Sequence, residues 1–221
     1  MLLLNKRSIE QLLNRSQVGK GPIMRKAGAE RREDIVGAAV AVLLDKGLAA
    51  ATTRDVTHRL GVGVGLLSHY FSWSELRALA FERIVRADLQ LSLDARANEP
   101  GQRVVDDLVA GAFATEADSI WRVWIEASDL AREDAHLAES VGRCTDLWRE
   151  GLVTLLKRGN DQADWQCDDP EGAAWRLLAL FDGLVGLVMA PRTKLERSDA
   201  TRHLSVAIAH ECRTQLGIPN Q

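Results

Sequence analysis

The chain has few of the features that mark disulfide-rich, membrane-spanning or secreted proteins. Its 221 residues include only 3 cysteines, Cys144, Cys167 and Cys212, which are odd in number and widely spaced. This usage argues against a disulfide framework and favours a reducing cytoplasm. No apolar run approaches the roughly 20 residues that span a bilayer. Residues 1–13 lack the charge order and cleavage site of a secretory signal, so a cytoplasmic protein without a membrane partner is expected.

Interrupting prolines and strand-like alternation are scarce as well. The 5 prolines all fall at plausible element boundaries, and none breaks a long periodic run. No segment alternates polar and apolar residues between turn signals, as a half-buried strand does. The sequence therefore predicts an all-α protein. Helices are expected over residues 29–46, 53–59, 63–70, 74–96, 102–116, 118–131, 135–159, 170–190 and 198–216.

Several of these helices have recognisable end signals. Gly47 follows the first helix as a C-terminal cap. Thr52 or Thr53 is expected to cap the second helix and Ser74 the fourth, because their hydroxyls can accept a free backbone N–H. Asp169 precedes the proline that opens the eighth helix, which is a favourable order for a helix start.

The charge is divided unevenly along the chain. Residues 1–77 carry 12 Lys and Arg against 7 Asp and Glu, a net of +5. Residues 78–221 carry 16 against 24, a net of −8, and the two parts add to the overall −3. A basic first third is expected if that part meets a polyanion, with ordinary compositional scatter as the alternative.

The glycine-rich stretch RLGVGVGLLSHYF, residues 59–71, has two possible interpretations. A dinucleotide-binding loop needs G-x-G-x-x-G after a strand, but the third glycine position is Leu66 and the preceding segment is polar. A P-loop needs Gly-Lys-Ser/Thr, which is absent. A helix-turn-helix needs two short helices joined by a turn that often contains glycine. The sequence fits the helix-turn-helix, with an inward-facing set of Val56, Leu60, Val62, Leu67 and Phe71.

Glycine, threonine and aromatic residues in and around this stretch occur at the spacing of a known sequence pattern. The pattern runs through Gly-x-x-x-x-Thr-x-x-x-[Ile/Val]-Ala to Gly-Val-Ser-x-Gly-x-Leu-Tyr-x-Tyr-Phe. The matching positions are Gly47, Thr52, Thr53, Val56, Gly61, Val62, Gly65, Leu67, Tyr70 and Phe71. On these residues the segment 31–85 resembles the DNA-binding domain of the tetracycline-repressor (TetR) family. The Ser-His-Tyr-Phe ending is similar to the betaine-regulator branch, and a looser likeness extends over residues 28–216.

The resemblance implies a domain organisation and a function. It implies a helix-turn-helix domain over 29–77 and a helical ligand-binding and dimerisation domain over 78–221. Residues 1–28, which carry Gly, Lys, Asn and Arg with weak periodicity, are expected to form a mobile arm. Such a protein is a ligand-responsive regulator, most often a repressor. It binds a palindromic operator in double-stranded DNA as a homodimer and responds to a small-molecule effector. The family's dimer interface corresponds here to residues 170–190 and 198–216, including an apolar stretch expected to be buried against a second copy or within the monomer.

The resemblance also implies which side chains touch DNA. Thr53 opens the second helix and is expected to donate to a phosphate. Arg54 aligns with a position that reads a guanine edge in some members of the family, with a solvated helix charge as the alternative. Val64 and Leu66 offer apolar surface for thymine methyl groups, with local packing as the alternative. The expected DNA contacts are Thr53, Arg54, Val64, Gly65, Leu66, Ser68, His69 and Tyr70.

Two departures from the family pattern affect the reading helix. Gly63 stands where the family has a serine cap, and Ser74 stands where a lysine commonly holds a phosphate. Gly63 and Gly65 each weaken the helix by roughly 1 kcal/mol relative to alanine. The helix is therefore expected to be loosely ordered until DNA holds it. The alternative function is a small-molecule-binding helical protein with a degenerate DNA-binding domain.

Aromatic residues of the later helices suggest an effector site. Their apolar faces, together with a carboxylate, favour a cationic or quaternary-ammonium ligand, although simple core packing is the alternative for each of them. The expected ligand-binding residues are Phe113, Trp121, Trp124, Glu126, Trp148 and Trp175.

Catalytic and metal-binding patterns are weak. Ser68 and His69 are adjacent in sequence, which is not a nucleophile–base arrangement, and no G-x-S-x-G is present. The cysteines and histidines do not have a recognised zinc-site spacing. The sequence therefore predicts no enzyme activity, no cofactor and no metal site.

Overall fold

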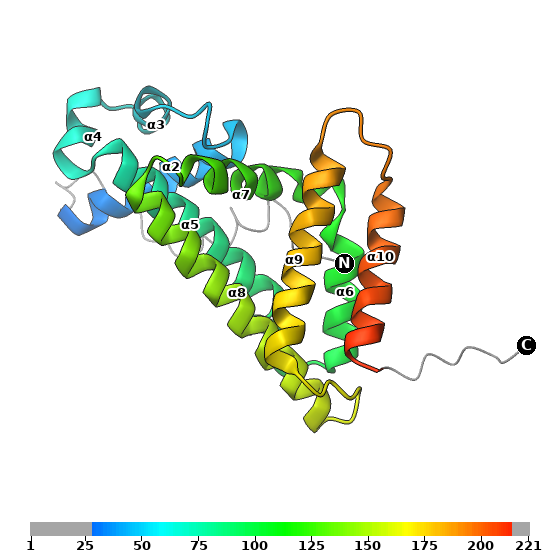
Figure 1. Ribbon diagram of the computed structural model, residues 1–221. Coiled ribbons are helices and arrows are strands. Elements are labelled where there is room, and N and C mark those ends of the chain that lie inside the picture. Colours follow the sequence, from blue (N-terminus) through cyan, green and yellow to red (C-terminus); the bar gives the residue numbers. More distant parts are fainter. Residues whose placement is uncertain (1–27, 214–221) are drawn as a thin grey trace, which may run out of the picture. The chain divides into compact units, whose positions relative to one another are not determined.

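The protein is described by a computed structural model of residues 28–213, in which all regular secondary structure is helical. The described residues form two compact units. The N-terminal unit comprises residues 28–88 and 119–144, and the C-terminal unit comprises residues 89–118 and 145–213. The predicted all-α class is confirmed (Figure 1).

The N-terminal unit contains the short helices that the sequence predicted. Its core is formed by apolar residues of α2, α3, α4 and α5, which recur at helical spacing. Within it α2 packs against α3, and α3 packs against α4 (Figure 1). Its helices are α2 (Gly28–Lys46), α3 (Thr53–Leu60), α4 (Val64–Tyr70), most of α5 (Trp73–Ser92), α7 (Asp118–Leu130) from Ser119 onward, and the first turns of α8 (Ala135–Asp161).

The C-terminal unit contains the longer helices. Here α10 packs against both α9 and α6, and α9 and α10 lie side by side (Figure 1). Its elements are the 3-10 turns η1 (Asp94–Arg96) and η2 (Thr115–Ala117), α6 (Gly101–Ala112), the remainder of α8, α9 (Pro170–Met189) and α10 (Arg197–Glu211).

The predicted helices are confirmed, with differences at some ends. Gly47 terminates α2 with φ of 85°, a left-handed conformation that glycine adopts without steric cost. Asp169 caps α9 by accepting from the Gly172 N–H at 2.9 Å. The helix expected over 74–96 ends at Ser92 and is followed by a 3-10 turn, and the helix expected over 102–116 ends at Ala112. The end predicted for the last helix, 214–216, lies outside the described residues.

The predicted cap at Ser74 is wrong. Helix α5 begins at Trp73, and Ser72 is its cap: the Ser72 hydroxyl accepts from the Glu75 N–H at 3.2 Å. Glu75 in turn accepts from the Ser72 N–H at 2.8 Å, which completes a capping box. The Ser74 hydroxyl instead donates to Asp134 at 2.7 Å. A glutamate three residues after Ser72 is the sequence signal that favours this earlier start.

The boundary predicted between residues 77 and 78 falls inside the continuous helix α5. Residues 119–144, which the sequence grouped with the ligand-binding part, pack with the N-terminal helices instead. The functional division of the chain stays a prediction. Each compact unit is built from segments that are not consecutive in the sequence.

Helix α9 is less buried in the single chain than its composition suggests. Leu187 is 55% exposed, and an 18-residue window with mean hydropathy 1.5 is only 28% buried. By length and composition α9 is therefore apolar enough to cross a bilayer. The expectation that no apolar segment approaches bilayer length does not hold for α9, in which Arg176 and Asp182 interrupt an otherwise apolar stretch. The buried residues of this helix are Ala173, Ala174, Leu177, Leu184 and Val185.

Candidate nucleic-acid interface

The start of α3 is fixed by a reciprocal capping box. The Thr52 hydroxyl accepts from the Asp55 N–H at 3.3 Å, and the Asp55 carboxylate accepts from the Thr52 N–H at 3.0 Å. Lys46 donates to the same carboxylate at 2.6 Å. The hydrogen bonds from Lys46 and Thr52 hold the pKa of Asp55 below its usual range. The first turn of α3 is therefore ordered, with Thr53 half-buried and Arg54 exposed.

The glycine-rich stretch forms the turn between α3 and α4. Gly61 has φ of 68° and its N–H donates to the His58 carbonyl at 3.2 Å, while the Val62 N–H donates to the Thr57 carbonyl at 3.1 Å. These bonds satisfy carbonyls at the end of α3 that have no partner within the helix. The stretch therefore ends one helix and begins the next, as a helix-turn-helix requires.

Helix α4 has a sparse set of internal anchors. Its cap, Gly63, offers no side-chain hydrogen bond, and Leu67 is its buried residue. Val64 is 49% exposed, and the Ser68 hydroxyl donates back to the Gly65 carbonyl at 3.1 Å. Most of the surface of this helix is consequently available to a partner.

The end of α4 is held by α2. The Arg32 guanidinium donates to the Tyr70 carbonyl at 2.9 Å and lies 4.1 Å from the centroid of the Phe71 ring. The His69 and Tyr70 rings meet edge to face, with centroids 5.4 Å apart. Sequence reasoning did not assign Arg32 to this contact. No local pattern indicates this contact, because Arg32 lies on α2, 38 residues before Tyr70. In the folded chain a cation meets the free carbonyl groups at the C-terminal end of α4.

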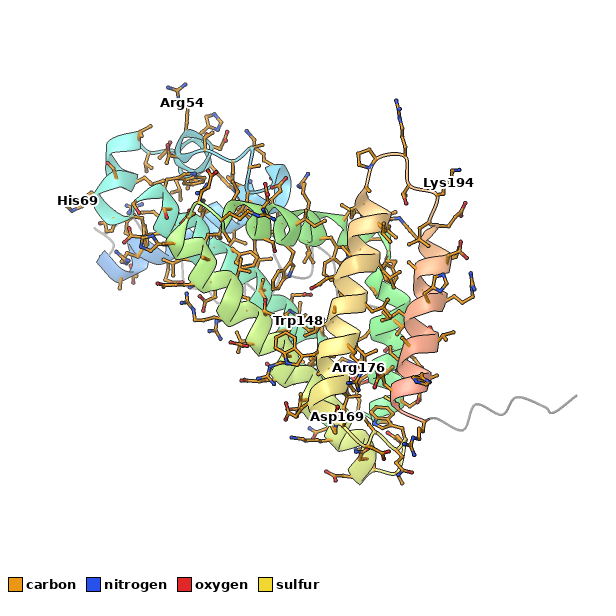
Figure 2. All side chains as sticks on the ribbon, viewed as in Figure 1. Arg54, His69, Trp148, Asp169, Arg176 and Lys194 are labelled. Carbon is orange, nitrogen blue, oxygen red and sulfur yellow. The ribbon has the colours of Figure 1, made fainter. Side chains whose placement is uncertain are left out.

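The structure brings the predicted DNA contacts together on two consecutive helices. Arg54 and His69 project away from α3 and α4 (Figure 2). Among the eight residues, Thr53, Leu66 and Tyr70 are half-buried, and the exposed ones are Arg54, Val64, Gly65, Ser68 and His69.

The predicted ligand-binding residues divide between the two units. In the N-terminal unit Trp121 is buried, and the Trp124 ring meets the Phe81 ring edge to face with centroids 5.1 Å apart. Glu126 accepts a hydrogen bond from the Ala49 N–H at 3.0 Å. Trp124 and Glu126 therefore each have a structural contact within the N-terminal unit.

The other three predicted ligand residues belong to the C-terminal unit. Phe113 is buried against Phe181, with ring centroids 5.7 Å apart. Trp148 is half-buried. Trp175 is 51% exposed, and the Arg149 guanidinium lies 5.8 Å from its ring centroid.

A groove of about 340 Å³ lies on the N-terminal unit, between α2 and α5, and it is lined by none of the six predicted ligand residues. Within residues 28–213, no group of three or more His, Cys, Asp and Glu side chains is placed to hold a metal ion. The residues that line the groove are Arg32, Glu33, Val36, Phe71, Leu79, Glu82, Arg83 and Arg86.

Comparison with known proteins identifies relatives of both parts of the chain. Residues 35–74 match the family model of bacterial regulatory proteins of the TetR family, and residues 97–213 match that of the BetI-type transcriptional repressor C-terminal domain. BetI from Rhizobium meliloti is 30% identical over 73% of this chain and 80% of its own. CymR from Pseudomonas putida is 26% identical over 85% of this chain and 95% of its own.

Solved structures share the fold. A transcriptional regulator from Saccharomonospora viridis, in complex with choline, superposes with a TM-score of 0.70 at 19% identity, over 83% of this chain and 98% of its own. A TetR-family regulator from a Rhodococcus species gives 0.68 at 21% identity, over 83% and 99%. The helix-turn-helix geometry and both family matches disfavour the alternative of a degenerate ligand-binding protein. The chain belongs to the TetR family of transcriptional regulators, with a BetI-type C-terminal domain.

Proposed function

We propose that this regulator is a repressor that inserts α4 into the major groove of a palindromic operator. The observation that carries the proposal is the exposed surface of α4, displayed by a turn and a capped α3. The second helix of a helix-turn-helix reads base edges in the major groove while the first crosses the backbone. Val64 suits the methyl group of thymine, and Ser68 suits a hydrogen bond to a base edge.

Contacts to the DNA backbone come from the ends of the same two helices. Thr53 and the free N–H groups at the start of α3 are suited to a phosphate, since a helix N-terminus favours an anion. His69 and Tyr70, at the end of α4, are suited to a second phosphate contact. Arg54 extends beyond these groups, which supports a bidentate contact with a guanine.

Dimerisation is proposed to occur through α9 and α10. Leu187 on α9 is 55% exposed and Val206 on α10 is 64% exposed. Large apolar side chains exposed on paired helices are covered in a stable assembly. A second copy of the same surface supplies that cover. A two-fold dimer matches a palindromic operator whose half-sites lie about 34–36 Å apart. In this arrangement α9 belongs to a cytoplasmic dimer and not to a membrane.

The operator is tested by selecting bound duplexes from a random pool at fixed, moderate salt. We expect an enriched palindrome, and we expect Arg54→Ala to lose about 1–3 kcal/mol and to relax the preference at one position. Arg132→Ala is the matched control, because Arg132 is 82% exposed in the same unit and carries the same charge. Failure of the wild type to enrich any sequence contradicts the proposal.

The dimer is tested by Leu187→Glu and Val206→Glu, each of which places a charge in the proposed interface twice. We expect the mass in analytical ultracentrifugation to fall from two chains to one chain of 24.3 kDa. Leu79→Glu is the control, since Leu79 is 43% exposed in the N-terminal unit. An unchanged dimer in both interface variants places the interface elsewhere.

The effector is proposed to be a small quaternary-ammonium compound bound beside aromatic side chains. Aromatic faces attract such cations by about 0.5–2 kcal/mol each, and the structural relative from Saccharomonospora viridis was solved with choline. Tryptophan fluorescence should report choline binding but not binding of its uncharged tert-butyl analogue. Trp148→Ala and Trp175→Ala should weaken it, with Trp73→Phe as the control. Equal affinity for the two compounds contradicts the proposed ligand class.

A further inference from the structure

Helix α7 contacts the segment that leads into α3, although nearly 80 residues separate them in sequence. Arg122 and Glu126 lie four residues apart on α7, so their side chains share one face of the helix. Both side chains contact the backbone at the end of α2 or in the turn that follows it. These contacts all lie within the N-terminal unit.

Arg122 holds the end of α2. Its Nη2 atom donates to the Leu44 carbonyl at 3.1 Å and to the Asp45 carbonyl at 3.0 Å. The last carbonyls of a helix have no partner within the helix and carry the negative end of its dipole. The Arg122 guanidinium therefore supplies hydrogen-bond donors to these carbonyls, and its positive charge is attracted to the negative end of the helix dipole.

Glu126 holds the turn itself. Its Oε2 atom accepts from the Ala49 N–H at 3.0 Å. At Gly47, a Cβ atom would come within 2.5 Å of the same oxygen, and φ there is 85°. Glycine is thus required for its conformation and for the close approach of the carboxylate. Leu48, in the same turn, is buried. The turn is therefore held both by the packing of Leu48 and by the hydrogen bond to Glu126.

The turn determines the direction in which α3 departs. Residues 47–52 connect the end of α2 to the Thr52 cap, and Thr53 and Arg54 follow immediately. We propose that Arg122 and Glu126 are positioning residues for operator binding, which orient α3 by fixing this turn and do not touch DNA. The inference rests on the proposed function, and it gives Glu126 a role that differs from the ligand contact expected from sequence.

The expected effect follows from the lost hydrogen bond. Without the Glu126 carboxylate the Ala49 N–H has no acceptor, and the turn can sample other conformations. The loss of one hydrogen bond to a charged group corresponds to about a tenfold change in an equilibrium constant. We expect Glu126→Ala to bind the operator about tenfold more weakly. Glu126→Gln, which retains an acceptor oxygen, should recover most of that loss.

The experiment combines two readouts on the full-length protein. Operator affinity is measured for Glu126→Ala, Glu126→Gln and Arg122→Lys, with Glu133→Ala as a control that removes an exposed carboxylate from the same unit. Hydrogen exchange of the Ala49 amide and of α3 is measured in the free protein. We expect faster exchange confined to the turn and α3 in Glu126→Ala, with α9 and α10 unchanged.

Several outcomes would overturn the inference. Wild-type affinity together with unchanged exchange at Ala49 in Glu126→Ala would do so, as would faster exchange spread evenly over the whole unit. If Glu126→Ala does not fold, rapid exchange of the Ala49 amide in the wild type refutes the contact, and slow exchange that Glu126→Gln retains supports it. A wild type that selects no duplex refutes the proposed function instead, while the exchange data still test the turn.

Discussion

Replacing Gly63 by serine and Gly65 by alanine is expected to order α4 in the free protein. Gly63 is the N-cap of α4 and provides no side-chain hydrogen bond. A Cβ atom at either position would meet no other atom within 4 Å. Both substitutions can therefore be accommodated without strain, and each removes a weakness of the helix.

The magnitude follows from the two local effects. Glycine within a helix costs about 0.5–1 kcal/mol relative to alanine, and a serine cap is better than a glycine cap by a few tenths of a kcal/mol. The double variant should therefore stabilise α4 by about 1 kcal/mol, which is close to a fivefold change in its local opening equilibrium. If free α4 is partly disordered, operator affinity rises by at most the same factor, because only the ordered fraction binds.

Hydrogen exchange of residues 67–71 measures this change directly. We expect about fivefold slower exchange there in the double variant and a smaller slowing for Gly63→Ser alone, which leaves the proposed DNA-facing position 65 unaltered. Gly142→Ala is the matched control, because it removes a glycine with equal space around it from α8. Unchanged exchange in the double variant, or strong protection of α4 in the wild type, would refute the idea that glycine limits the order of α4.

Three further predictions concern stability and reactivity. Thr52→Ala removes the capping box of α3 and should lower the free energy of unfolding, measured by chemical denaturation, by about 1 kcal/mol. Thr52→Ser keeps the hydroxyl and should retain most of the wild-type stability. Although burial opposes the shift, hydrogen bonds from Ser74 and Arg77 hold the pKa of Asp134 below its usual value. The stability that Asp134 contributes to the folded protein is therefore fully present above the unfolded-state pKa, near 3.9, and is lost as the pH falls through the lower folded-state pKa. Asp134→Asn should lower stability at pH 7 by about 2 kcal/mol and flatten this acid-side dependence. Burial raises the pKa of the Cys144 thiol to about 12, so a thiol reagent at pH 8 should modify it only after unfolding; rapid modification of the native protein would contradict its burial.

Part of the candidate interface could be predicted because its signals are local. The caps at Thr52 and Asp169 and the turn at Gly61 depend on neighbours within four residues. The eight predicted DNA contacts therefore fall on two adjacent helices, as expected. Ser74 was misassigned because two serines two residues apart compete for one cap, and only Ser72 has a glutamate three residues later.

The ligand-binding residues could not be placed by the same reasoning. Glu126 was expected beside a cationic ligand, but its carboxylate accepts the N–H of Ala49, 77 residues away. Trp175 is half exposed next to Arg149, and its role in ligand binding stays a prediction. Aromatic and acidic residues at helical spacing indicate a shared face of one helix, but they do not identify what that face contacts.

The sequence by itself determined the helical class, nearly all helix positions and the helix-turn-helix, because helix periodicity, caps and glycine turns act over three or four residues. Only the tertiary structure decided that α7 packs with the N-terminal helices, that Arg122 and Glu126 hold the turn before α3, and that α9 leaves an apolar surface exposed. These outcomes depend on which helix faces meet. That choice is made by shape and hydrogen bonding between segments far apart in the chain, where local patterns carry little information.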